Sequence, residues 1–243
     1  MPVSGETLDL VDIKVTGYDP FDIKEESGGA YGEVNIQTIT DVGVTEASYV
    51  WNDFIEIDYD GEGNNRTWYG WFADGEEEAA KRGELIFAPG EGFLLICESY
   101  DFPFALQSAG QVLTVADQEV DLQLHEKLVS NPTPVTVDLT ACYVGGYDPF
   151  VIETEAGGAY GEVNVQKITD VGVTEESYVW NDFIEIDYDG EGNNRTWYGW
   201  YADGEEEPIS KGTSTVAAGE GLLVICESFD YDYTFVWPKV DVK

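Results

Sequence analysis

An internal duplication constrains this chain more than any other feature. Residues 53–71 and 182–200 are identical, and the longer segments 31–78 and 160–207 differ at only four positions, with a constant offset of 129 residues. Repetition at a fixed offset indicates two units of one fold in tandem. The predicted organisation is repeat 1 over residues 1–116, a connector with an extra strand over 117–132, and repeat 2 over 133–243.

The local pattern is that of strands. In the duplicated segment Ile55 and Ile57 alternate with Glu56 and Asp58, and turn-forming sequences such as DGEGNN and PGEG separate the apolar runs. The only helix candidate, 121–130, is equally compatible with a strand. Short strands separated by turns at this density predict an all-β protein of two tandem, duplicated β-sandwich modules of the jelly-roll or immunoglobulin-like kind.

The charge excludes several classes of partner. The chain has 49 acidic and 11 basic residues, a net charge of −38. Such a surface repels phosphate backbones and anionic lipids, so we expect no nucleic-acid binding, and without a long apolar run we expect no membrane insertion. The first residues lack the pattern of a signal peptide. The acidic, lysine-poor composition favours an exported protein, so we predict the mature form of an extracellular or cell-surface protein.

The repeated loop is the best candidate for a metal site. Asp58, Asp60 and Glu62 alternate ahead of Gly63, which resembles the first half of a calcium-binding loop. The twelfth position is Tyr69 rather than the usual bidentate glutamate. The alternative is a plain β-hairpin turn with solvated acids. The predicted Ca²⁺ ligands are Asp58, Asp60, Glu62 and Asn64, with Asp187, Asp189, Glu191 and Asn193 in repeat 2.

Aromatic residues flank each loop. Exposed tryptophan and tyrosine rings suit stacking on the faces of sugars, whereas buried rings would fill the core or its rim. Alternation places Tyr69 and Trp71 on one face, and Trp68 and Phe72 on the other. At least one of these sets must therefore lie outside the core or be covered by a neighbour. The candidate sugar-binding residues are Trp51, Tyr69, Trp71, Trp180, Tyr198 and Trp200.

The sequence offers little for catalysis. The single histidine, His125, lies in the connector, so a nucleophile–histidine arrangement cannot exist in both repeats, and no phosphate-binding loop is present. We therefore expect no enzymatic activity. Cys97 and Cys226 are equivalent positions in buried-looking strands. Cys142 could pair with Cys226, or all three could be buried thiols.

One stretch resembles a known class of repeat. The path from GWFADG to APGEGFLLICES, which returns as GWYADG and AAGEGLLVICES, resembles a β-sandwich repeat of secreted and surface proteins of bacteria. The resemblance covers about two-thirds of each repeat and implies an extracellular, non-catalytic building block. It does not account for the DYDGEGNN segment.

These observations together predict a structural subunit that assembles with copies of itself as a homopolymer. The alternative is a carbohydrate-binding or adhesive module that contacts polysaccharide through the aromatic residues. The connector has one alternating stretch, Val120, Leu122 and Leu124, for two sandwiches. One repeat would then keep an open edge that a neighbouring chain could fill with residues 1–7 or 237–243, unless repeat 2 is complete with one strand fewer.

Overall fold

The computed structural model has an all-β fold. It describes residues 7–17, 34–41, 44–51, 55–56, 58–64, 66–67, 69–97, 105–107, 116–122, 126–146, 163–170, 173–180, 184–185, 187, 189–193, 195–196, 198–202, 204–226 and 233–240. Within these ranges the only helical segments are two 3-10 turns, η1 (Leu10–Asp12) and η2 (Leu139–Ala141). The prediction of an all-β protein is therefore confirmed.

The two repeats form their strands in the same order. Repeat 1 forms β1 (Leu8–Asp9), β2 (Lys14–Thr16), β3 (Val34–Asp41), β4 (Val44–Trp51), β5 (Ile55–Glu56), β6 (Arg66–Thr67), β7 (Trp71–Ala73), β8 (Ile86–Phe87), β9 (Leu94–Cys97) and β10 (Ala105–Gln107). The connector forms β11 (Gln118–Asp121) and β12 (Glu126–Ser130). Repeat 2 forms β13 (Val137–Asp138), β14 (Tyr143–Gly145), β15 (Val163–Asp170), β16 (Val173–Trp180), β17 (Ile184–Glu185), β18 (Arg195–Thr196), β19 (Trp200–Ala202), β20 (Thr215–Val216), β21 (Gly221–Cys226) and β22 (Thr234–Trp237).

The strands of each repeat pair in several open antiparallel sheets. The main sheet has the order β7-β4-β3-β9 in repeat 1, and β19-β16-β15-β21 in repeat 2, where β12 is added next to β21. Three smaller pairings also recur: β1 with β8 and β13 with β20, β2 with β10 and β14 with β22, and β5 with β6 and β17 with β18. The duplicated sequence therefore gives the same strand order twice.

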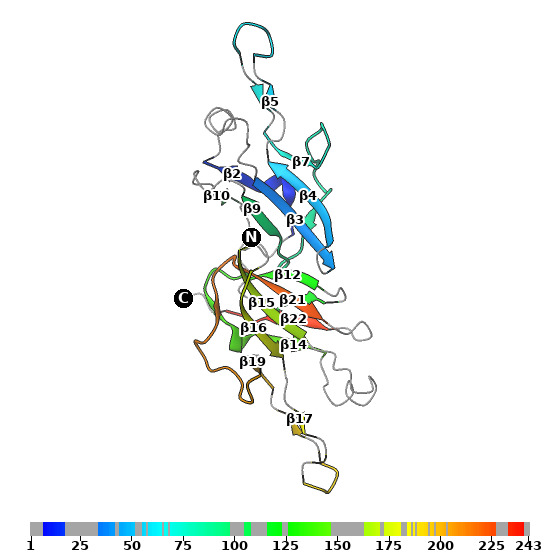
Figure 1. Ribbon diagram of the computed structural model, residues 1–243, viewed down its shortest axis with the longest axis vertical. Helices are drawn as coiled ribbons and strands as arrows, with labels where there is room; N and C mark the ends of the chain where they lie inside the picture. Colours follow the sequence, from blue (N-terminus) through cyan, green and yellow to red (C-terminus); the bar gives the residue numbers. More distant parts are fainter. Residues whose placement is uncertain are drawn as a thin grey trace.

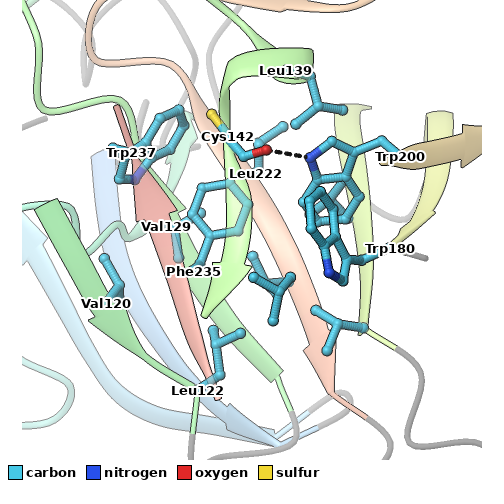
Figure 2. Packing of buried hydrophobic residues seen from close by; sticks show 14 of the residues in the cluster. Val120, Leu122, Val129, Leu139, Cys142, Trp180, Trp200, Leu222, Phe235 and Trp237 are labelled. Atoms are coloured by element: carbon cyan, nitrogen blue, oxygen red, sulfur yellow. Dashed lines mark hydrogen bonds between the residues drawn. The ribbon is translucent and has the colours of Figure 1, made fainter. Parts of the chain in front are cut away.

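The buried side chains form two clusters, one for each repeat. Trp71 is central in the first, where its indole Nε1 donates a hydrogen bond to the carbonyl of Ile13 at 2.8 Å. Trp200 repeats this contact in the second cluster by donating to the carbonyl of Cys142 at 2.9 Å (Figure 2). Each ring also packs edge-on against a second tryptophan, Trp51 or Trp180. The backbone thus satisfies the buried indole N–H of Trp71 and of Trp200.

The connector differs from the prediction, because it contains two strands rather than one. β11 pairs with β22, and β12 pairs with β21. The other edge of β12 bridges repeat 1, where Val129 lies opposite Glu91 and Leu128 accepts a hydrogen bond from the amide of Gly92 at 2.8 Å. Val120 of the predicted extra strand lies in β11, and β12 is a second connector strand that contacts both repeats.

This arrangement also affects the predicted strand donors. Trp237 lies in β22, pairs with Gln118 and is fully buried, so it already belongs to repeat 2. Val240 packs against the same core. Residues 1–6 and 241–243 lie outside the described residues, as do Leu124 and His125 of the connector.

The two repeats follow one another along the longest axis of the molecule. The β5–β6 hairpin projects from one end, and the β17–β18 hairpin projects from the opposite end (Figure 1). The connector strand β12 is the edge strand of the main sheet of repeat 2 and lies near the middle of the molecule, where it bridges repeat 1 (Figure 1). The two identical hairpins therefore lie at opposite ends of the molecule.

Candidate functional site

Each projecting hairpin begins with a two-residue ladder. In repeat 1, Ile55 lies opposite Thr67, and Glu56 lies opposite Arg66. The Arg66 guanidinium donates to the Glu56 carboxylate and lies over the ring of Tyr59, 4.6 Å from its centroid. These contacts are exposed, so they orient the side chains of the hairpin more than they stabilise the fold.

The loop at the tip is closed by its own backbone and side chains. Asp58 adopts a left-handed conformation with φ of 49°, and its Oδ1 accepts from the amide of Gly63 at 2.5 Å. The amide of Tyr59 donates to the carbonyl of Asn64 at 2.9 Å. Gly63 also has a positive φ, 84°, which only glycine adopts without strain. The repeated glycine of the motif is thus required by the turn itself.

Asp60 accepts further hydrogen bonds within the same loop. Its Oδ1 accepts from the amide of Glu62 at 3.0 Å, and its Oδ2 accepts from the side-chain amide of Asn64 at 2.6 Å. The hydrogen bond from Asn64 is the main reason that the pKa of Asp60 lies below its ordinary value. Asp189 and Asn193 form the same contact in repeat 2 and lower the pKa of Asp189 in the same way. Both aspartates are therefore ionised acceptors at neutral pH.

The predicted calcium ligands all lie in these loops and are exposed: Asp58, Asp60, Glu62, Asn64, Asp187, Asp189, Glu191 and Asn193. Asp58 and Asp60 each direct an oxygen at amide groups of the loop. Among the described residues, no group of three or more histidine, cysteine or acidic side chains is arranged to hold a metal ion. Calcium binding therefore stays a prediction, and an ion would have to replace hydrogen bonds within the loop.

We predict that calcium raises the melting temperature through both loops, with dissociation constants of about 10⁻⁴ to 10⁻³ M, as in extracellular calcium modules. Removing Asp60 and Asp189 together by alanine substitution should abolish the shift, and either substitution alone should leave one site. Isothermal calorimetry and thermal melting with and without millimolar calcium test this. Asp74→Ala, an exposed aspartate outside the loops, is the control for lost charge. If a calorimetric titration of the unmodified chain with calcium shows no heat of binding, the prediction is contradicted.

The candidate aromatic residues separate into two groups. Trp51, Trp71, Trp180 and Trp200 are buried, with at most 7% of each residue exposed. Tyr69 and Tyr198 are 67% and 64% exposed. The four tryptophans therefore belong to the cores, so the six residues do not form a flat exposed strip, and only the two tyrosines present a free ring face. Trp68 and Trp197 lie outside the described residues.

A pocket of about 410 Å³ lies where the hairpin of repeat 1 joins the core. Its aromatic walls come from Trp51, Tyr69 and Trp71, which are the three candidate sugar-binding residues of this repeat. The exposed Lys14 and the adjacent pair Ala79–Ala80 complete its edges. The volume lies in the range of small-molecule sites, about 300–1,000 Å³.

Two parts of this pocket were not predicted from the sequence. Lys14 and Thr16 come from β2, about forty residues before the hairpin in sequence, and no local pattern links them to it. Ala79–Ala80 begin the stretch AAKRGELIFAP, where the two repeats diverge beside an otherwise identical block. That divergence was the available signal, because a changed segment next to a preserved scaffold indicates a surface whose chemistry differs between the repeats.

One wall of the pocket carries a polar atom with no partner. The indole Nε1 of Trp51 is buried and has no acceptor among the described residues. The indole Nε1 of the equivalent Trp180 is likewise buried, with no acceptor among the described residues. Buried donors are nearly always paired, so these two N–H groups are suited to an acceptor supplied by water or by a ligand hydroxyl.

The two cysteines whose side chains the structure describes give no sign of a reactive centre, and the side chain of Cys97 lies outside that description. Cys142 and Cys226 are both buried thiols, so the alternative of a disulfide between them is not the state of this structure. Burial raises the pKa of Cys142 far above its ordinary value, which keeps the sulfur protonated and unreactive. The absence of enzymatic activity stays a prediction.

Comparison of the chain with models of protein families, with curated proteins and with solved structures finds no match in any of the three. In the part of the chain that the structure describes, no helix is long and apolar enough to cross a membrane. The function is therefore inferred from the hairpins and the pocket.

Proposed function

We propose that the chain is a structural subunit of an extracellular or cell-surface assembly, a filament, tube or appendage, in which it associates with copies of itself. In this proposal each repeat is a β-sandwich that serves as a rigid holder for one hairpin. The observation that carries the proposal is the placement of two identical hairpins, residues 53–71 and 182–200, at opposite ends of one elongated molecule (Figure 1).

Identical tips at both ends give each subunit two equivalent binding surfaces. A tip that pairs with the same tip of another chain makes a self-complementary contact, in which each side contributes the same residues. Because every subunit carries a second tip facing the opposite way, such contacts do not close into a dimer. They extend into a linear polymer.

The charge of the tips explains how association could be controlled. Asp58, Asp60 and Glu62 are all exposed in each tip, so two tips brought together repel one another. A divalent cation that bridges carboxylates from both chains would remove this repulsion. We therefore propose that calcium promotes the tip-to-tip contact, and that assembly is weak without it.

We predict that replacing loop residues 58–64 with Asn-Gly stops assembly at dimers, because each chain then keeps one tip. The same replacement of 187–193 should have an equal effect, and replacing both loops should leave monomers. Asn-Gly closes a two-residue hairpin, so β5 and β6 can still pair. Sedimentation velocity and negative-stain microscopy, each with and without millimolar calcium, measure the outcome.

Three outcomes distinguish this proposal from its rivals. Polymers that persist when both tips are removed would place the contact elsewhere on the chain. A monomer in all conditions would contradict the structural role altogether. Unequal effects of the two replacements would contradict tip-to-tip pairing of identical loops and favour a head-to-tail contact between the two ends.

The second candidate is a carbohydrate-binding or adhesive function. The specific observation in its favour is the pocket at the base of the repeat 1 hairpin, because Trp51, Tyr69 and Trp71 all line it. Aromatic walls with a few polar groups at the edges are typical of sites for small organic ligands, and a sugar ring presents an apolar face as well as hydroxyl groups. The two functions are compatible in one surface protein.

A further inference from the structure

We infer that the sugar site belongs to repeat 1 alone, and that a proline and an isoleucine close the equivalent site in repeat 2. This inference rests on the carbohydrate-binding function proposed above. It concerns the pair Ala79–Ala80, which lines the pocket, and its counterpart Pro208–Ile209.

The two pairs occupy the same backbone position. Ala79 bridges Phe72, and Pro208 bridges Tyr201 in the same antiparallel manner. The amide of the following residue donates to the carbonyl of the central tryptophan at 2.7 Å in both repeats, from Ala80 to Trp71 and from Ile209 to Trp200. The main chain is thus preserved, and the difference between the sites lies in the side chains.

Pro208 places more atoms beside the glycine that precedes the central tryptophan than Ala79 does. A Cβ atom built on Gly70 would meet only the Cβ of Ala79, at 3.2 Å, whereas one built on Gly199 would meet both the Cβ and the Cγ of Pro208, at 2.9 and 3.8 Å. Ile209 packs against the core of repeat 2, as the smaller Ala80 does in repeat 1. The wall of the site is therefore bulkier in repeat 2.

The polar edge of the site differs as well. Lys14 and Thr16 line the pocket of repeat 1, and their counterparts in repeat 2 are Tyr143 and Gly145. Lys14 can donate to ligand hydroxyls. The Thr16 hydroxyl donates to the carbonyl of Ala105 at 3.1 Å, which leaves its oxygen able to accept. At these two positions repeat 2 thus has neither the lysine ammonium nor the threonine hydroxyl, and the exposed phenol of Tyr143 is its only polar side chain there.

These features define the ligand as a neutral sugar ring. The exposed face of Tyr69 can stack on the apolar face of the ring, and Lys14 and Thr16 can bind its hydroxyls. An anionic sugar would approach a chain of net charge −38 against repulsion. Among the described residues, the indole N–H of Trp51 and that of Trp180 both lack a partner, so selection between the repeats depends on the wall and the polar edge of the site.

The test uses the full chain and three neutral probes, namely cellohexaose, laminarihexaose and mannohexaose. Calorimetry and tryptophan fluorescence should show one site per chain for at least one probe. The double substitution Ala79→Pro with Ala80→Ile should abolish binding, and it introduces only residues that the same backbone accepts in repeat 2. Tyr69→Ala should weaken binding by at least about tenfold, whereas the matched Tyr198→Ala should change it by less than about twofold.

The outcomes separate the inference from the function on which it rests. If the unmodified chain binds none of the probes, both the proposed carbohydrate function and this site are contradicted. If the chain binds a probe and the doubly substituted chain binds it equally, carbohydrate binding stands and the assignment to this pocket is wrong. Loss of binding in Tyr198→Ala, with Tyr69→Ala unaffected, would place the site in repeat 2 and also contradict the inference.

Discussion

Replacing Asn131 with alanine is expected to lower the free energy of unfolding of repeat 2 by about 3 kcal/mol, because several buried hydrogen bonds are lost together. Asn131 follows β12 and is fully buried. Its side-chain Nδ2 donates to the carbonyls of Val135 and Val216 at 2.8 and 2.9 Å. Its Oδ1 accepts from the amide and the hydroxyl of Thr133, at 3.0 and 2.7 Å.

The expected loss of stability is large because the alanine side chain forms no hydrogen bonds with the groups that Asn131 leaves behind. A buried amide or hydroxyl left without a partner costs about 1–3 kcal/mol, and water has little access to this position. The backbone of Asn131 also continues the ladder past β12, since its amide donates to the carbonyl of Glu220 and its carbonyl accepts from Gly219. The side chain therefore fixes the turn that leads from the connector into repeat 2.

Denaturant unfolding followed by tryptophan fluorescence and circular dichroism measures this effect. Asn64→Ala is the control, because Asn64 is an exposed asparagine of a tip loop and its loss should leave global stability nearly unchanged. A shift of less than about 1 kcal/mol for Asn131→Ala would mean that water replaces the lost groups and would contradict the buried network.

Asn131 also illustrates where prediction from the sequence ended. The sequence predicted the all-β class because alternation and turn residues are local signals that each strand carries in its own sequence. The function of Asn131 depends on carbonyls of residues 216 and 217, far away in sequence. Repeat 1 gives no guide, since the equivalent of Asn131 is Pro2.

The second connector strand was not predicted, for a related reason. No local pattern in residues 126–130 shows that both edges of β12 will be used. The structure pairs one edge with β21 and the other with Glu91, and Lys127 from β12 forms an ion pair with Glu91 at 2.8 Å. Contacts of this kind depend on how two folded repeats meet, which periodicity within either repeat does not determine.

The same ion pair accounts for one of the four differences in the duplicated block. Glu220, the counterpart of Glu91, forms its ion pair with Lys167 inside repeat 2, at 3.6 Å. Repeat 1 has Thr38 at the position of Lys167, and Lys127 of the connector supplies the cation instead. Each repeat therefore retains one cation beside this glutamate, in one case from its own sheet and in the other from the connector.

A second difference is matched by a change elsewhere in the same repeat. Glu176 replaces Ala47, and its carboxylate accepts a hydrogen bond at 2.8 Å from the hydroxyl of Ser214. The counterpart of Ser214 is Leu85, which packs against the core of repeat 1. Alanine and leucine at these positions of repeat 1 thus correspond to two polar residues that are hydrogen-bonded to each other in repeat 2, although the positions lie 38 residues apart. The candidate pocket likewise depends on residues from distant strands, so the sequence alone identified its aromatic walls and missed its edges.

The contact between the repeats leads to the second prediction of large effect. Gly90→Ala is expected to destabilise the chain by about 2–4 kcal/mol, through backbone strain and overpacking together. Gly90 has φ of 85°, and a Cβ atom there would lie 2.7 Å from Cγ2 of Val120 and 3.3 Å from Cδ1 of Trp237. Its carbonyl also accepts a hydrogen bond at 2.8 Å from the amide of Ser130.

Gly83→Ala separates the two contributions, because Gly83 has a similar φ of 91° and a Cβ atom there would meet nothing within 4 Å. This control should cost only about 1 kcal/mol, the strain of a non-glycine residue in a left-handed conformation. The excess for Gly90→Ala then measures the packing of repeat 1 against β11 and β22, the strands that hold Val120 and Trp237. If the two substitutions cost the same, the repeats do not pack tightly at this point. If Gly90→Ala costs more, it should also separate the unfolding transitions of the two repeats in calorimetry, because the contact that couples them is weakened.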